Sequence, residues 1–298
     1  MALNIQKLAD AIVEPITLAQ AHHQCRIDAG CTLDDVLWLV YISAARQLAE
    51  KVTRRAFFNQ TWQRTLDNFP LAASFDYTPS PADKWNWPVY GGMWNRLTID
   101  LPMGRALAIN AITYIDASGN PQTLPASQYY ADLSGIPCRL TPSQAAESGM
   151  VWPWQGSYLP GSVNIQWQAG SYVQLVTETF QAPSAAPWTY QLKQPSVTAV
   201  VSVVNAAGAS VTGWTFAPGL IGLPSTLTLP AAEAGLQLTV SYYVAALPAD
   251  LLVAMLMLVG HFYRNPEATT DLKMEQLPIG VQALLSSHVV EWTDYRPC

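Results

Sequence analysis

The chain has 298 residues, half of them apolar and only 12% charged, so it can bury a large core but carries about half the usual share of charge. Fifteen Lys and Arg against 21 Asp and Glu give a formal charge of −6, which disfavours both a basic nucleic-acid-binding surface and attraction to an anionic membrane. The 11 Trp and 13 Tyr fit a surface that other protein covers, because interface cores are poor in charge and rich in aromatic residues.

Residues 15–56 have the pattern of two helices. Thr17 with Gln20, and Thr32 with Asp35, have the spacing of a helix-capping pair, so each pair predicts a helix start. In the second helix apolar residues recur every three or four positions, which predicts one buried stripe: Leu33, Leu37, Val40, Ala44, Leu48 and Val52. The opposite side carries charged residues at a spacing that lets opposite charges support each other, namely Arg46, Glu50 and Arg54.

Residues 57–243 are typical of all-β structure, because short runs of Val, Ile, Tyr and Trp alternate with turn signals. The expected strands are 59–66, 96–101, 111–116, 162–168, 199–205 and 236–244. Segments 112–119 and 201–208 align, and each ends in a glycine that can adopt a positive φ. This predicts two related β modules joined by the linker 181–187, although any two hairpins with such a turn would look alike.

Helical periodicity returns after residue 247, where Pro248 and Asp250 suit a helix start, and a short last helix is expected from residue 277. The predicted fold is therefore α+β, with the terminal helices forming one helical bundle and a large all-β insertion of two tandem β modules between them. The expected boundaries are 1–56 and 247–290 for the two helical parts, 57–176 and 177–246 for the β modules, and 291–298 for a C-terminal tail.

Signatures of secretion, membrane insertion and catalysis are missing. The N-terminal residues do not resemble a signal peptide, and the strongest apolar run, 251–260, is shorter than the roughly 20 residues that span a bilayer, so it predicts a buried core helix. The sequence contains no G-x-S-x-G, no phosphate-binding glycine loop and no H-E-x-x-H, and an enzyme would have to gather distant groups such as Asp76, Asp83 and Asp132. We expect no enzyme and no cofactor.

Possible metal ligands are concentrated in one segment, at His22, His23, Cys25 and Cys31. They lack the paired C-x-x-C or H-x3-H spacing that presents ligands to one ion, so we expect an ordinary helix edge and no metal. The four cysteines are too few and too scattered for a disulfide framework, which fits a reducing compartment. His261 and His288 lie in apolar helical contexts that predict packed side chains.

Several short segments occur in the same order as in a known family. Near the N-terminus these are EPITLAQA (14–21), CRID (25–28), LAEKVTRRA (48–56), QTW (60–62) and LDNFP (66–70); near the C-terminus they are LPADL (247–251), HFYRNPEA (261–268) and LPIGV (277–281). Over roughly 14–130 and 163–290 the chain resembles the tailed-phage head–tail connector proteins, also called adaptor or head-completion proteins. It departs from the smaller relatives by the additional β module 177–246.

The resemblance implies a non-enzymatic structural protein of the virion neck, made in the host cytoplasm. It would form a homo-oligomeric ring under the portal protein, dodecameric in the family's usual arrangement, extend the DNA channel and join the head to a downstream neck or tail protein. DNA would pass through the ring without sequence-specific binding, and no membrane would be involved. The alternative is a carbohydrate- or receptor-binding β module of a phage tail or surface protein.

Two groups of aromatic residues are candidate contact sites. The C-terminal tail carries Trp292, Tyr295 and Arg296, which we expect to bind the portal or else to fold back on the chain's own helices. Loops of the β region carry Trp85, Trp87, Trp94, Trp152 and Trp154. These tryptophans are expected to act as hydrophobic plugs and inter-subunit or neck contacts, and the alternative is a stacking platform for sugars.

Overall fold

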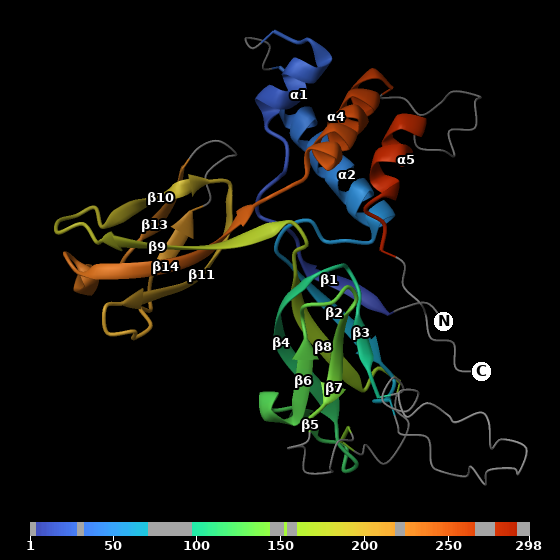
Figure 1. Cartoon of the computed structure of the whole chain (residues 1–298), viewed down its shortest axis with the longest axis vertical. Helices are drawn as coiled ribbons and strands as arrows, with labels where there is room; N and C mark the ends of the chain where they lie inside the picture. Colours follow the sequence, from blue (N-terminus) through green and yellow to red (C-terminus); the bar gives the residue numbers. More distant parts are fainter. Residues whose placement is uncertain are drawn as a thin grey trace, which may run out of the picture. The chain divides into compact units, whose positions relative to one another are not determined.

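The computed structural model of the chain describes residues 4–28, 33–70, 97–143, 152–153, 160–217, 224–265 and 278–290. Helices and antiparallel sheets are both present, so the fold is α+β. The chain divides into two compact units (Figure 1): unit 1 takes the described residues of Met1–Asp10 and Gln60–Ala169, and unit 2 those of Ala11–Asn59 and Gly170–Glu291.

Unit 1 contains a five-stranded antiparallel sheet in the order β1-β2-β8-β4-β5. Its strands are β1 (Ile5–Ala9), β2 (Gln60–Leu66), β8 (Val163–Ala169), β4 (Ala106–Ile115) and β5 (Pro121–Thr123). Alternate residues of the central strand β8, including Ile165 and Trp167, are fully buried, so one face of the sheet supplies the core. Trp167 lies opposite Trp62 of β2 in the register.

A second sheet of unit 1 has the order β3-β7-β6, with β3 at Ile99–Leu101, β7 at Cys138–Pro142 and β6 at Tyr129–Asp132. The buried thiol of Cys138 accepts a hydrogen bond from the Ala106 N–H at 3.1 Å, which joins this sheet to the first. Burial raises the pKa of that thiol, so Cys138 is a packing residue and not a reactive one.

Unit 2 contains two three-stranded antiparallel sheets, in the orders β11-β14-β9 and β10-β13-β12. The strands are β9 (Val173–Gln181), β10 (Thr189–Pro195), β11 (Val197–Asn205), β12 (Thr215–Ala217), β13 (Pro224–Thr228) and β14 (Gln237–Ala245). Both sheets contribute to one apolar cluster, in which Phe180, Leu227 and Tyr242 are buried. The two sheets therefore pack face to face around a common core.

Four of the six expected strands agree closely with observed ones, but the expected strand 111–116 begins five residues earlier at Ala106, and 96–101 begins at Ile99. Strand β1, which pairs with β2, was not predicted, because its short sequence IQKLA lies at a sheet edge and lacks a clear apolar alternation. Strand β9 was missed because polar Thr and Gln residues line its exposed face.

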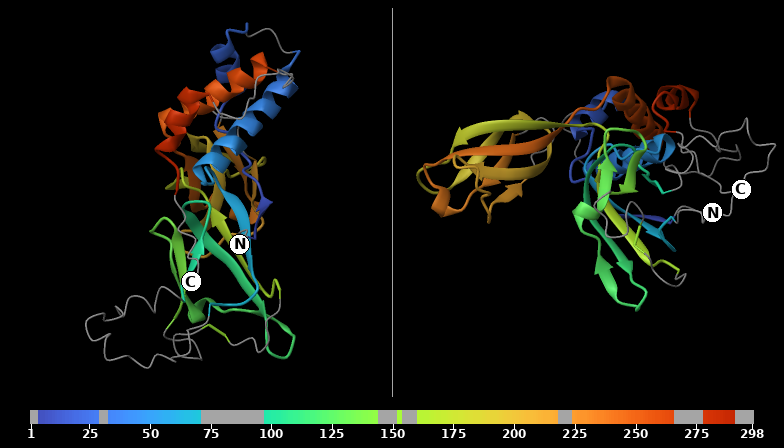
Figure 2. Two further views of the ribbon diagram at one scale, coloured as in Figure 1. Left: turned by 90° about the vertical axis from the view of Figure 1, so that its right-hand side faces the viewer. Right: turned by 60° about the horizontal axis from the view of Figure 1, so that its bottom comes forward.

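The helices of unit 2 are α1 (Leu18–Cys25), α2 (Asp35–Thr53), α4 (Ala249–Arg264) and α5 (Ile279–Ser286). Helix α4 contacts the other three, and α2 contacts α1 and α5, so helices from both ends of the sequence pack together (Figures 1 and 2). The predicted capping box at Thr17 and Gln20 is confirmed, with both reciprocal hydrogen bonds present. The second predicted start is wrong, because α2 begins at Asp35 with Asp34 as its N-cap.

The predicted buried stripe of α2 is also wrong. Leu33, Leu37 and Val40 are exposed, whereas the buried apolar positions are Trp38, Ile42, Ala45 and Ala49 on the other face. That face also buries Arg46 and Glu50, although their spacing in the sequence predicts the side opposite the core. Helix α2 is apolar on two sides, so periodicity alone does not identify which side α1 and α4 cover.

The two aligned turns have the same backbone structure. In the first, the Asp116 side chain accepts hydrogen bonds from the N–H groups of Ser118 and Asn120, and Gly119 has a φ of 84°. In the second, the Asn205 side chain accepts from the N–H groups two and four residues ahead, and the glycine three residues after it has a φ of 79°. This shared turn is what the aligned sequences predict, and it is consistent with two related β modules.

Candidate interaction sites

A hydrogen-bond network anchors the residues that lead into the C-terminal tail. The Val290 N–H donates to the Thr53 carbonyl at 3.0 Å, and Arg55 Nε donates to the His288 carbonyl at 2.7 Å. Thr53 is the last residue of α2, and Arg55 follows two residues later. Val290, the last described residue before the tail, is therefore fixed to the end of α2.

The His288 side chain extends this anchor to two more elements. Its Nε2 lies 2.6 Å from Asp250 Oδ2 on α4, and its Nδ1 lies 2.8 Å from the Tyr172 hydroxyl. Because a carboxylate only accepts, Nε2 carries the proton, and in the neutral imidazole Nδ1 then accepts from Tyr172. Burial raises the pKa of the Tyr172 hydroxyl, so it remains a donor, and the chain of three groups acts as a structural clamp.

The clamp gives stability a predictable pH dependence. The hydrogen bond from His288 holds the pKa of the Asp250 carboxyl below its usual range, and the Leu251 N–H adds to this effect. A carboxyl with a lowered folded-state pKa stabilises the fold above its unfolded pKa of about 4, and this contribution is lost as the pH falls through the folded pKa. Stability measured by denaturant unfolding should therefore fall more steeply in acid for the parent chain than for Asp250→Asn.

The matched control is Asp28→Asn, which removes an exposed carboxylate of the same unit. We expect its stability to run parallel to that of the parent chain through the acid range. If the Asp250→Asn curve also stays parallel to the parent, the clamp contributes nothing to folding.

A buried ionic cluster ties the residues before α1 to α2. Arg46 forms a two-pronged pair with Glu14, with nitrogen–oxygen distances of 2.8 and 3.0 Å, and its third nitrogen donates to Glu50 Oε2 at 3.0 Å. The other oxygen of Glu50 accepts the Phe57 N–H at 2.9 Å. Arg46 is 1% exposed and Glu50 5%, so these charges depend on each other for their solvation.

The aromatic residues predicted as subunit contacts lie mostly outside the described residues, which include neither Trp85, Trp87, Trp94 and Trp154 nor the tail residues Trp292, Tyr295 and Arg296. Trp152 is described. Its ring stacks on Phe69 at 5.0 Å between centroids, and its Nε1–H donates to the Leu97 carbonyl at 2.7 Å. Trp152 thus fills the interior of unit 1, and its buried ring offers no face to a sugar. The contact roles of this group remain predictions.

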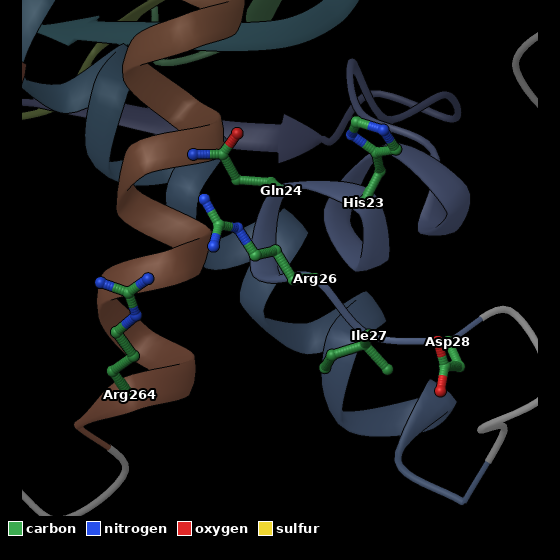
Figure 3. A pocket seen from close by; sticks show the side chains of 6 residues that line it. All are labelled: His23, Gln24, Arg26, Ile27, Asp28 and Arg264. Atoms are coloured by element: carbon green, nitrogen blue, oxygen red, sulfur yellow. The ribbon is translucent and has the colours of Figure 1, made fainter.

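The segment with possible metal ligands forms one wall of a surface pocket of about 920 Å³, lined by His23, Gln24, Arg26, Ile27, Asp28 and Arg264. In Figure 3 the side chains of Arg26 and Arg264 lie on the same side, along α4. His22 points elsewhere and packs its ring edge-on against Trp38, with centroids 5.3 Å apart. Burial raises the pKa of the Cys25 thiol, and Arg264 partly offsets that effect.

Within the described ranges, no three His, Cys, Asp or Glu side chains are grouped so that they could hold a metal ion. Cys31, Asp76 and Asp83 lie outside those ranges. Asp132 accepts hydrogen bonds from the backbone and side chain of Ser134, which lower the pKa of its carboxyl. This is the arrangement of a turn residue. No described helix is long and apolar enough to cross a membrane.

No family model matches the sequence, and no curated protein matches it either. Two solved structures are similar in fold. A chain of the "Neck of empty GTA particle computed with C6 symmetry" is 16% identical, with a TM-score of 0.51 over 98% of this chain and 99% of that chain. A chain of the "Virion of native gene transfer agent (GTA) particle" is 15% identical, with a TM-score of 0.50 over the same shares. This protein therefore has a fold that also occurs in the virion of a gene transfer agent, over nearly the full length of both chains.

Proposed function

We propose that this protein is a structural component of the neck of a phage-like virion, made in the host cytoplasm and assembled at the head–tail interface. The observation that carries the proposal is the fold likeness to a chain from the neck of a gene transfer agent particle, which extends over 98% of this chain. The ordered segments that resemble head–tail connector proteins support the same role from the sequence. A neck component needs no catalytic group.

In this role the chain forms a ring under the portal protein and extends the DNA channel. The helices within the parts 1–56 and 247–290 form the connector core, as one bundle into which the β modules are inserted, while β1 belongs to the sheet of unit 1. The C6 symmetry of the similar neck structure supports rotational assembly and is compatible with the twelve subunits usual among connectors. A net charge of −6 suits a channel through which DNA slides, because tight phosphate binding would retain the DNA.

The C-terminal tail is the proposed portal contact, and another face of the ring receives the downstream neck or tail protein. The network at Thr53, Arg55 and His288 supports this proposal, because it fixes the residues that precede the tail in the sequence. Trp292, Tyr295 and Arg296 are the residue types that dominate interface energies. Rigid anchoring of the preceding residues lowers the entropic cost of docking such a segment.

Ring formation is tested with the full chain by light scattering and negative-stain imaging, alone and with purified portal protein. Rings of one defined stoichiometry support the proposal. A chain that stays monomeric under both conditions contradicts it. Glycan binding by that monomer would favour the carbohydrate-binding alternative.

Portal docking is tested by ending the chain after Val290, which keeps the hydrogen bond to Thr53. We expect at least a tenfold loss of affinity for purified portal, because an aromatic or Arg anchor is worth about 2 kcal/mol or more. Triple alanine replacement of Trp292, Tyr295 and Arg296 should reproduce the loss, whereas alanine at Thr293 and Asp294 should not. Undiminished portal binding by the shortened chain excludes the tail as the docking element.

A further inference from the structure

The outward side of α2 is apolar and exposed over its N-terminal half. Leu33, in the turn just before α2, is 91% exposed, and on the helix Val36 is 78% and Val40 58% exposed. We call this the α2 surface; it consists of Leu33, Val36, Leu37, Leu39 and Val40. No charged residue occurs between Asp35 and Arg46. A helix that is apolar all round is normally covered all round, yet among the described residues the buried apolar side chains of α2 are those of the face with Trp38 and Ile42.

The size of the α2 surface is that of an interaction site. Five large apolar side chains at these exposures present on the order of several hundred Å², as large as the largest apolar patch on a typical monomer. That area is roughly half of the ~800 Å² that each partner contributes to a standard protein interface. A partner that covers the α2 surface therefore needs only a rim of further contacts to form a stable complex.

A second uncharged surface lies on other helices of the same unit. Helix α5 has the sequence IGVQALLS, without a single charge. Its residues Ile279, Gly280 and Ala283 are exposed, as is Val253 of α4, and we call these four residues the α5 surface. Ala283 has only a methyl side chain and leaves room for large side chains to approach the helix, whereas the space beside Gly280 is taken by Met257 of α4.

We propose that the α2 surface of one subunit packs against the α5 surface of a second copy of this chain. The inference rests on the proposed function, because a ring is closed by heterologous contacts in which each subunit offers two different patches. The two surfaces meet this requirement, because they lie on different helices and neither carries charge. Charge depletion is the compositional mark of an interface core.

The first test places a charge in the α2 surface. Val40→Glu should raise, at least tenfold, the protein concentration below which rings dissociate. The reason is that the carboxylate would lose its solvation in the contact. Gln47→Glu is the matched control, since Gln47 is exposed and seven residues, about two turns, further along the same side of α2. It should assemble like the parent chain. Far-UV circular dichroism and thermal unfolding of both variants verify that the helices are intact.

The second test identifies the occupant by cross-linking. Val36→Cys and Ile279→Cys chains are mixed under ring-forming conditions and treated with a short bifunctional maleimide, with the parent chain as the control for its natural cysteines. We expect cross-linked dimers above the parent background only in the mixture. Cross-linking of Val36→Cys chains with each other would show that two α2 surfaces meet, which overturns the inference.

Failure of this inference differs from failure of the proposed function. If Val40→Glu forms the same rings as the parent chain, the α2 surface is not part of the subunit contact. The proposed neck role is unaffected by that result. If the parent chain forms no ring, either alone or on the portal, the proposed function is wrong. If rings form only on the portal, the same two tests are made on that complex.

Discussion

Replacement of Arg46 by alanine is expected to destabilise unit 2 by about 3–5 kcal/mol, the usual cost of removing one partner of a buried ion pair. Without the guanidinium, the carboxylates of Glu14 and Glu50 lose their shared counter-charge, and Glu50 is 5% exposed. Glu50 also holds the Phe57 N–H, so the turn after α2 loses its support as well. Denaturant unfolding followed by far-UV circular dichroism measures the loss.

Lys51→Ala is the matched control, because Lys51 is an exposed cation on the same helix. Its effect should stay within about 0.5 kcal/mol. An Arg46→Ala chain as stable as the Lys51→Ala chain would mean that the cluster is open to solvent. Since the cluster lies next to the anchor of the tail at Thr53 and Arg55, portal binding of Arg46→Ala should weaken along with stability.

Replacement of Trp38 by alanine should cost a similar 3–5 kcal/mol, because it empties the largest buried site on α2. The Trp38 ring stacks on Tyr263 of α4 at 4.3 Å and meets the edge of His22. The comparison is Leu37→Ala, one residue away, at a position the helical period identifies as core and the structure leaves 43% exposed. We expect Leu37→Ala to cost about 1 kcal/mol or less.

The same unfolding measurement decides between the two faces, at a concentration where the chain is monomeric so that assembly does not contribute. If Leu37→Ala were the more costly change, the stripe predicted from the sequence would be the core and the α2 surface would not exist. Trp38→Phe, which keeps an aromatic ring against Tyr263, should recover part of the stability.

Helix positions were well predicted, whereas the chemistry around His288 was not. The start of α1 follows from Thr17 and Gln20, since a capping box is a local pattern. His288 was expected to be a packed histidine, but its contacts to Tyr172 and Asp250 join positions 116 and 38 residues away. No local pattern relates such positions, so only the folded chain reveals the clamp.

The candidate interaction sites were likewise predictable only in part. The tryptophans and the uncharged composition are visible in the sequence and indicate a chain that other protein covers. The interior position of Trp152 was not predictable, because it depends on Phe69 and on the Leu97 carbonyl, both more than fifty residues away. A tryptophan in a loop can lie in the core or face solvent, and the local sequence is the same in both cases.

By itself, the sequence determined the α+β class, the capped start of α1, the positions of four strands and the turns at Asp116 and Asn205, because all of these follow from interactions within a few residues. The tertiary structure alone decided which side of α2 is core. Apolar residues on two sides give two equivalent stripes, and the choice is made by long-range packing, in which Trp38 meets Tyr263 and Arg46 meets Glu14. The stripe left over, with Leu33 and Val40, is the surface available to another subunit.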